Sequence, residues 1–527
     1  MRGFARNRKG DSIMKKPNTL QRLLCLLLAL ALMLALGVSL AGCAGPSSGA
    51  NGETKTVRIN ISADPDSLDP WLSSATDTEA IFHNVFEGLC LYDTAGDIVP
   101  GLAESWDISE DGLTYTFHLR QDVVFHNGKK MTSADVLYSY NELTGLGGEE
   151  ALTSKFSMIE SLEAPDDYTF VVHVSAPSAA FLSLAIVAVL PEGYEEQETK
   201  PVGAGPFRFA EYTPSQRIVL EKYEDYYGKN ESPARAPQID RVEVYIMDDL
   251  AAVVAALRSG QLDIAAMLNA EDAPVLEGEF DIYNSPQNMV QSLFLNLESE
   301  PFLDVRVRQA VCYAVDQEEI VNGVFDGYAT PLPSNFSPVM ATYYNEELEG
   351  AYPHDTERAK ALLKEAGYED GFSMTITVPA TYQAHIDTAQ VIAQQLAAVG
   401  IDAEIKLIEW ATWLEDVYQN AKYQTTIVGL SGKLDPDSVL GRYESTYRSN
   451  FFHFADREYD ELIAAARVEL DDAKRAEEYK RCQEILTEQA AAVYLTDPNL
   501  IVACRKDLKG YAFYPVTFYD FSTLYYE

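Results

Sequence analysis

Two stretches of this chain carry the pattern of a buried strand, a helix and a second strand. They span residues 242–267 and 373–408. Gly260 and Gly400 follow the two helical segments, where a glycine commonly ends a helix. A strand, a helix and a strand in this order predict a parallel strand pair with a right-handed crossover. We therefore expect two α/β bodies, one towards each end of the chain.

Between these bodies and around them, other local patterns predict further elements. Alternating apolar residues favour strands at 56–62, 112–119 and 168–174, and Thr132 suits the start of a helix. The strands and helix between residues 90 and 204 suggest a small inserted α+β unit. An apolar stripe before Gly367 predicts a helix, and residues 458–495 are expected to be largely helical. The stripe consists of Ala359, Leu362, Leu363 and Ala366.

The first 42 residues have the composition of an export signal. A basic segment is followed by an uncharged apolar run, residues 23–40, that ends in Leu40-Ala41-Gly42-Cys43. About 20 apolar residues could also span a bilayer as an uncleaved helix, but small residues and a cysteine end this run instead of a charged stop. These four residues resemble the lipobox of bacterial lipoproteins, which implies cleavage before Cys43 and a lipid on its sulfur. Whether Met1 or Met14 starts the protein stays open.

The remaining composition limits the possible function classes. With 81 acidic and 40 basic residues the formal net charge is −41, which argues against nucleic acid as a partner. Residues 43–55 are expected to be a flexible Gly/Ser-rich linker. The cysteines after Cys43 are widely separated, so buried free thiols are expected, and the seven histidines show no metal-ligand spacing. We therefore expect neither a metal nor a cofactor.

Six motifs together resemble the solute-binding proteins of ABC importers for peptides and nickel, known as family 5. They occur in the family order over nearly all of the chain after the signal. The motifs are residues 64–70 (DPDSLDP), 85–89 (VFEGL), 100–106 (PGLAESW), 124–129 (VFHNGK), 201–207 (PVGAGPF) and 305–310 (VRVRQA).

The resemblance implies an α/β fold similar to type II periplasmic binding proteins, with two lobes around a cleft and an additional inserted α+β domain. It implies a non-enzymatic, monomeric, lipid-anchored protein outside the cytoplasmic membrane that captures peptides and delivers them to an ABC permease. The implied divisions are a signal (1–42), a linker (43–55), lobe I (56–89, 205–290 and 495–527), inserted domain II (90–204) and lobe III (291–494).

The resemblance also indicates which residues should line the cleft. They lie at the end of the first strand, in a glycine turn, around two tryptophans and in a loop that precedes a proline. The expected set is Ala63, Asp64, Gly203, Ala204, Gly205, Trp410, Trp413, Ser431, Gly432, Lys433 and Asp435. Some of these residues could instead have a purely structural role: the tryptophans could pack in the core, and Asp64 and Asp435 could stabilise turns.

One position departs from the pattern that the resemblance implies. Peptide binders of the family place an aspartate three residues before the acidic-Pro pair, where it holds the peptide amine. Counting back from Asp435-Pro436 gives Gly432, so that carboxylate is missing here. Lys433 beside it would suit a carboxylate or another anion better. The departure affects the expected ligand and leaves the expected fold untouched.

Other functions remain as alternatives. A binding protein for nickel, a metal chelate or another small anion, and a receptor coupled to a sensor, would use the same fold. A secreted hydrolase is a remote alternative, because residues 203–205 lack the third glycine of a dinucleotide loop and no phosphate-binding loop or zinc motif occurs. Residues 45–49 match Gly-x-Ser-x-Gly, but they lie in the linker with no strand or helix to form a nucleophile elbow.

Overall fold

The computed structural model describes residues 54–148, 150–231 and 235–527. The expected signal segment, Cys43 and most of the expected linker lie outside the described residues. Among the described residues, no helix is both long and apolar enough to cross a membrane.

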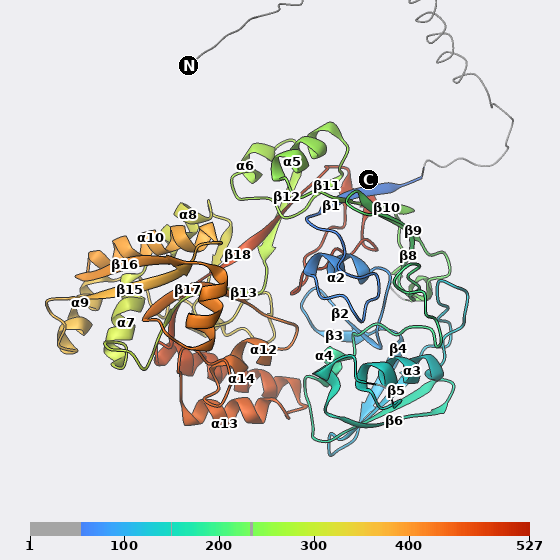
Figure 1. The fold of residues 1–527 in the computed structure, drawn as a ribbon, viewed down its shortest axis with the longest axis horizontal. Coiled ribbons are helices and arrows are strands. Elements are labelled where there is room, and N and C mark those ends of the chain that lie inside the picture. The colour runs from blue at the N-terminus through green and yellow to red at the C-terminus, as the bar shows by residue number, and fades with distance from the viewer. Residues whose placement is uncertain (1–53, 149, 232–234) are drawn as a thin grey trace, which may run out of the picture. The chain divides into compact units, whose positions relative to one another are not determined.

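A large mixed sheet runs through the described chain, and one strand connects its two halves. The strand order is β16-β15-β17-β13-β18-β11-β1-β10-β9-β8, with β12 and β14 also pairing β18. The 13-residue strand β18 (Ala492–Cys504) pairs with β13 through its first part and with β11 and β12 through its last part. Figure 1 shows β18 running between the two halves. The chain therefore builds two α/β halves on a shared strand.

The first half surrounds β1, whose residues Val57, Ile59 and Ile61 are buried. The region between residues 242 and 267 contains β10, α5 and β11 as expected, but β10 and β11 are not neighbours. Strand β1 lies between them and is parallel to both. The α5 crossover therefore passes over β1 before the chain enters β11. The elements are β1 (Thr56–Ile61), α2 (Thr76–Phe82), β8 (Phe207–Thr213), β9 (Arg217–Lys222), η2 (Tyr227–Asn230), β10 (Arg241–Ile246), α5 (Leu250–Ser259), β11 (Ile264–Ala265), α6 (Ala273–Leu276), β12 (Asp281–Pro286), β19 (Leu508–Lys509) and β20 (Tyr525–Tyr526).

The second half confirms the other strand-helix-strand prediction. Strands β15 and β16 pair in parallel from Phe372↔Ile401 to Pro379↔Ile408, and Gly400 before β16 has a positive φ of 89°. The elements are β13 (Met289–Leu295), α7 (Val305–Ala314), α8 (Gln317–Val324), β14 (Ala329–Pro331), η3 (Glu346–Leu348), α9 (Thr356–Glu365), β15 (Phe372–Pro379), α10 (Gln383–Ala397), β16 (Ile401–Ile408), α11 (Trp410–Thr412), η4 (Trp413–Gln419), β17 (Thr425–Ser431), α12 (Asp437–Leu440), η5 (Gly441–Tyr443), α13 (Arg457–Ala466) and α14 (Asp472–Glu488).

A separate antiparallel sheet occupies the segment that was expected to be an inserted unit. Its strand order is β4-β5-β7-β6, and α3 begins at the expected Thr132, where Thr132 and Asp135 form a capping box. The elements are β2 (Cys90–Tyr92), β3 (Ile98–Pro100), β4 (Ala103–Ile108), β5 (Thr114–Leu119), α3 (Ser133–Thr144), η1 (Ser154–Phe156), β6 (Ile159–Asp166), β7 (Thr169–Val174) and α4 (Phe181–Leu184).

The prediction that residues 458–495 are largely helical holds only as far as Glu488. The chain turns at Ala490, which has a positive φ of 46°, and β18 begins at Ala492. The run Ala-Val-Tyr-Leu suits a buried helix and a buried strand equally well, so local pattern could not separate them. Pairing with β13 on one side decides in favour of the strand.

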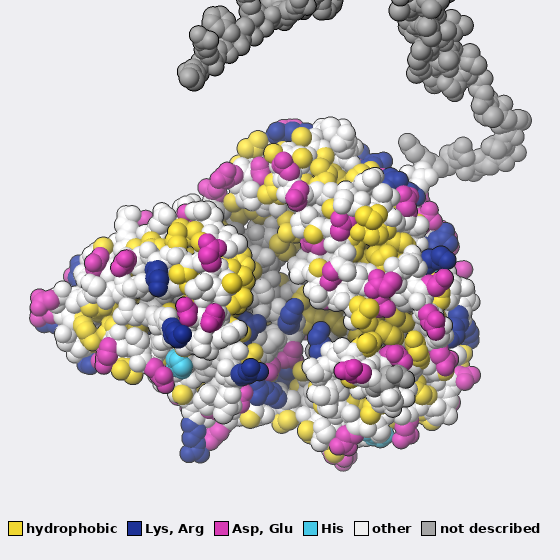
Figure 2. All heavy atoms as spheres, viewed as in Figure 1, with side chains coloured by type: hydrophobic (Ala, Val, Ile, Leu, Met, Phe, Trp, Pro, Cys, Tyr) yellow, Lys and Arg dark blue, Asp and Glu magenta, His cyan; other side chains and the backbone are white. Residues whose placement is uncertain are grey.

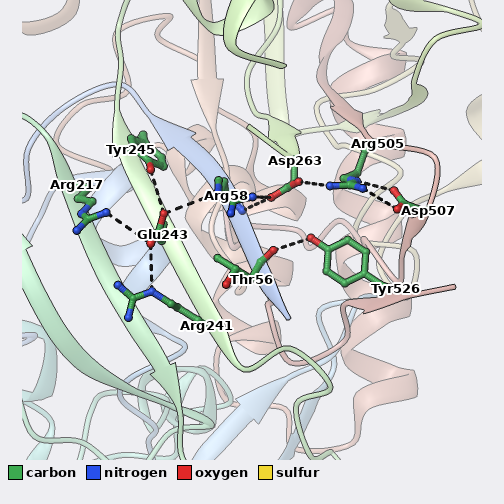
Figure 3. A network of polar contacts seen from close by, with 10 residues as sticks. All are labelled: Thr56, Arg58, Arg217, Arg241, Glu243, Tyr245, Asp263, Arg505, Asp507 and Tyr526. Carbon is green, nitrogen blue, oxygen red and sulfur yellow. Dashed lines mark hydrogen bonds and ion pairs between the residues drawn. The ribbon is translucent and has the colours of Figure 1, made fainter. Parts of the chain in front are cut away.

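Charged side chains connect the beginning and the end of the described chain. Asp263, whose side chain is fully buried, binds Arg58 of β1 at 3.3 Å and Arg505 at 2.8 Å. Figure 3 shows this network, in which Glu243 extends it to β9 and Tyr526 donates a hydrogen bond to the Thr56 carbonyl oxygen. The network holds β1 against the C-terminal segment.

Candidate functional site

The loop that follows β17 contacts both halves of the molecule. Ser431 ends β17, which pairs with β13, and Leu434 packs against Tyr92 and Tyr514 of the opposite half. A cavity of about 460 Å³ adjoins the same loop. Its walls come from residues 176–180 and Met158 on one side and from Asp435, Asp437, Ser438, Arg467 and Arg475 on the other. Figure 2 shows a hollow between the halves with Lys and Arg side chains at its border.

Asn288 packs against Gly432, which occupies the position where the peptide binders of the family have an aspartate. The Gly432 N–H donates to the Asn288 carbonyl oxygen at 2.7 Å, and the Asn288 amide donates to the Lys433 carbonyl oxygen at 3.1 Å. Asn288 is buried and has a left-handed backbone with φ of 59°. A Cβ at position 432 would overlap the Asn288 side-chain amide. The fold therefore leaves no room for a carboxylate side chain at this position.

Asp435 is committed to a buried ion pair. Its Oδ2 lies 2.6 Å from Arg475 of α14, and the two side chains are 13% and 6% exposed. Arg475 also donates to the Ala466 carbonyl oxygen and to the Tyr343 hydroxyl. The carboxylate thus fixes the loop to α14, although its residue lines the cavity.

Lys433 and Glu79 approach each other from opposite halves. Burial raises the pKa of the Glu79 carboxyl on α2, while the positive charges of Lys433 and Lys155 act in the other direction. Neither lysine lies within ion-pair distance of a carboxylate among the described residues. The Tyr92 hydroxyl, also buried in this region, has no hydrogen-bond partner in the described part of the chain. Glu79 and Lys433 are exposed and leave polar groups available for a ligand, whereas the Tyr92 hydroxyl is buried.

The two tryptophans stack but differ in exposure. The ring centroids of Trp410 and Trp413 lie 5.1 Å apart at 4°. Trp413 is buried and its indole N–H donates to Thr426 at 2.9 Å, so it belongs to the core. Trp410 is partly exposed, and Tyr382 packs edge-on against it at 5.4 Å. A ligand could therefore reach the aromatic surface formed by Trp410 and Tyr382, but not Trp413.

Asp64 holds a neighbouring hairpin. It accepts hydrogen bonds from the Tyr212 hydroxyl at 2.7 Å and from the Ser215 N–H at 2.7 Å. These hydrogen bonds, led by that of the Ser215 N–H, hold the pKa of Asp64 below its usual value. Ala63 beside it is exposed. The turn role considered for Asp64 therefore accounts for its carboxylate.

The glycine turn at residues 203–205 is buried and serves backbone packing. A Cβ on Gly203 would overlap the Val85 carbonyl oxygen, and one on Gly205 would overlap the Asn84 carbonyl oxygen. His126 accepts from the Gly203 N–H at 3.2 Å, and its other ring nitrogen lies 3.0 Å from the Gly205 carbonyl oxygen. Ala204 between the glycines is also buried. The structure gives these three residues a packing role and places Ser431 and Lys433 at an exposed turn.

Several residues at this site had no signal in the sequence. Asn288, Leu434 and Arg442 lie outside any motif, and only the fold brings Glu79 and Tyr92 towards residues 431–434. The described residues contain no group of three or more His, Cys, Asp or Glu side chains arranged to hold a metal ion.

Comparison with known proteins identifies the family of the chain. The sequence model of the bacterial extracellular solute-binding proteins, family 5, matches residues 97–451. The dipeptide-binding protein of Escherichia coli K12 is 28% identical, with 93% of this chain and 98% of the relative covered.

Two solved structures extend this comparison. The Helicobacter pylori periplasmic binding protein DppA in complex with the peptide STSA is 28% identical with a TM-score of 0.69, over 90% of this chain and 98% of the other. AgaA from A. tumefaciens R10 in complex with agropinic acid is 30% identical with a TM-score of 0.67, over 90% of this chain and 99% of the other. The fold is that of type II periplasmic binding proteins. The chain belongs to the bacterial extracellular solute-binding proteins of family 5.

Proposed function

We propose that this protein is a lipid-anchored solute-binding protein of an ABC importer that captures peptides between its two lobes and delivers them to a membrane permease. The observation that carries the proposal is the family match over residues 97–451. Relatives named for dipeptide and for di- and tripeptide binding, each 28% identical over at least 87% of this chain, favour peptides as the solute.

The site geometry supports capture of an elongated, polar solute. The loop from Ser431 to Asp435 meets the opposite half through Leu434, so a ligand lying beside it can contact both halves. Glu79 and Lys433 supply polar groups, and Trp410 supplies a flat apolar surface. A site with few polar anchors and an apolar wall suits loose recognition of many peptides.

The proposal includes the division of the chain that was expected from its sequence. Residues 1–42 are the export signal, Cys43 carries the lipid, and residues 43–55 tether the binding domains to the outer face of the membrane. Lobe I, inserted domain II and lobe III follow with the boundaries given above. A tether raises the effective concentration of the binding protein near a permease in the same membrane. We further propose that the protein is a monomer without enzymatic activity.

Mass spectrometry of the purified chain tests the peptide assignment. We expect peptides of a few residues to be released when the protein is denatured, and fluorescently labelled peptides to be displaced by the same pool. Release of a metal or a non-peptide solute alone, with no displacement by peptides, would contradict it.

Labelling cells with radioactive palmitate tests the anchor. Wild-type protein should incorporate the label and Cys43→Ala should not. Equal labelling of both would remove Cys43 as the site of lipid attachment.

A second candidate, a small anionic solute, is favoured by one observation. The structurally similar AgaA is in complex with agropinic acid, and this chain has Lys433 beside Gly432, the position where the amine-binding aspartate is missing. The same released-ligand experiment distinguishes this solute from peptides.

A further inference from the structure

Two cations flank the turn at Ser431 and Gly432 without a carboxylate partner. Lys433 is exposed, and Arg442 donates its one side-chain hydrogen bond within the described residues to the Ser431 carbonyl oxygen at 2.8 Å. Neither forms an ion pair in the described part of the chain, whereas nearby Arg467 and Arg475 both do. An anion is the natural complement to the turn.

Arg442 is a second positive charge near the turn that an anion would stabilise. Burial lowers the pKa of its guanidinium, and the side chains around it are the uncharged Tyr447, Tyr418 and Tyr443. A guanidinium has five N–H donors, and most of those on Arg442 find no acceptor among the described residues. A partly buried cation without a counter-charge is costly, and a ligand anion nearby would offset that cost.

The opposite half does not neutralise this positive charge. On that side Glu79 lies close enough to feel the charge of Lys433, and it also feels the charges of Lys155 and Asp66. The Asp66 carboxylate already accepts hydrogen bonds from Ser74, Ala75 and Thr78. The Glu79 carboxylate interacts with Lys433 beyond ion-pair distance, and it accepts no hydrogen bond within the described part of the chain.

The turn itself lacks the carboxylate that would hold a peptide amine. Position 432 is a glycine, and the Asn288 side chain fills the space where a Cβ of residue 432 would lie. The nearest acids along the chain, Asp435 and Asp437, are committed to Arg475 and Arg467. The turn thus offers donors and positive charge, with no free carboxylate of its own.

We propose that the solute is recognised through a carboxylate that binds Lys433 at this turn, with Arg442 below Ser431 supplying a second positive charge. The inference rests on the proposed function and names its substrate class: solutes with a free carboxylate, whose amino end need not be free. Lys433 is then the residue that determines specificity.

Paired ligands that differ in one charge test the inference. Isothermal titration would use tri-alanine with both ends free, N-acetylated or C-amidated, and the non-peptide pair gluconate and gluconamide. Amidation should weaken binding to the wild type at least about tenfold, the loss expected for one charge-assisted contact, and N-acetylation should change it less than about threefold.

Matched variants localise the effect to Lys433. In Lys433→Gln the loss on amidation should shrink below about threefold, and Lys433→Arg should retain it because the charge is kept. Lys360→Gln removes the same charge from α9, which contacts α7 rather than the turn, and should behave as the wild type. Circular dichroism and melting temperature establish that each variant is folded.

The outcomes separate the inference from the proposed function. Peptides that bind equally well after amidation, or that bind only with a free amine, overturn the carboxylate inference while peptide capture stands. Binding of gluconate alone, dependent on Lys433, upholds the inference and overturns peptide capture. Failure of every carboxylate probe to bind overturns both.

Discussion

The ion pair between Asp435 and Arg475 is expected to stabilise the fold and to contribute little to ligand affinity. Asp435→Asn keeps the shape of the side chain but removes the negative charge 2.6 Å from the guanidinium. The two side chains are only 13% and 6% exposed, so water replaces the lost partner poorly. Breaking a buried pair in this way typically costs 3–5 kcal/mol, and we expect about 3 kcal/mol here. The lower value follows because Arg475 keeps Ala466 and Tyr343 as acceptors.

A double-mutant cycle separates the pair from its surroundings. Arg475→Met removes the guanidinium and should cost about 3–4 kcal/mol, since Asp435 then remains buried without its partner. The double variant should cost about the same as Arg475→Met alone, which gives a coupling energy of about 3 kcal/mol. Lys360→Gln, which breaks an exposed pair with Glu357, should cost less than about 0.5 kcal/mol.

Urea unfolding followed by far-UV circular dichroism measures these changes as shifts of the midpoint at constant slope. Isothermal titration of the same samples with a peptide that binds the wild type measures the affinity of each variant for that peptide. Additive single losses would refute the coupling. An unchanged midpoint for Asp435→Asn with a tenfold weaker affinity would instead make Asp435 a ligand contact.

Three further predictions follow from buried groups. The pKa of His83 is lowered to about 4 by burial, below its value of 6.5 in the unfolded chain. The stabilisation that the neutral ring gives to the fold is therefore fully present above pH 6.5 and is lost as the pH falls towards 4. Between pH 7.5 and 4.5, the free energy of unfolding measured in urea should fall by up to about 3 kcal/mol less in His83→Phe than in the wild type. Gly203→Ala should lower the free energy of unfolding by more than about 2 kcal/mol, because the added Cβ meets the Val85 carbonyl oxygen. As a control, Gly323→Ala places a Cβ in open space on α8 and should leave the free energy of unfolding unchanged or raise it. Equal effects of the two substitutions would contradict the packing role of Gly203. The four described cysteines are free and buried, and burial raises the pKa of each thiol, so a thiol reagent should label them only in denaturant; rapid labelling of the native protein would contradict this.

Local patterns in the sequence were sufficient for elements whose partners lie nearby in the chain. The alternation in β1, the stripe in α9 and the capping residue Thr132 of α3 each state locally which face is buried. Strand β18 is different, because its residues 492–495 are apolar on both faces and only pairing with β13 makes them a strand. A helix or strand can be predicted from the sequence where its apolar residues show a clear period, and residues 492–495 of β18 show none.

The candidate site shows the same limit more strongly. The resemblance placed Ser431, Lys433 and Asp435 together in a cleft loop; in the structure Ser431 and Lys433 are exposed, whereas Asp435 pairs with Arg475, which lies 40 positions away. The contacts of Leu434 with Tyr92 and Tyr514 span still longer separations. Such contacts depend on how the two halves meet, and no local pattern encodes them.

Asn288 connects the candidate ligand turn with the place where the chain passes between the halves. Asp497 of β18 is fully buried and accepts hydrogen bonds from the Gln287 N–H at 3.0 Å and the Met289 N–H at 3.1 Å, on either side of Asn288. On its other side, Asn288 accepts from the Gly432 N–H at 2.7 Å. A change in the angle between β12 and β13 must therefore move Gly432 with Asn288 or break these bonds. Family members of this kind bind solutes between lobes that move about such crossings. The proposed capture at Lys433 would thus be coupled to the geometry of the crossing through one asparagine, whose side chain occupies the space beside Gly432.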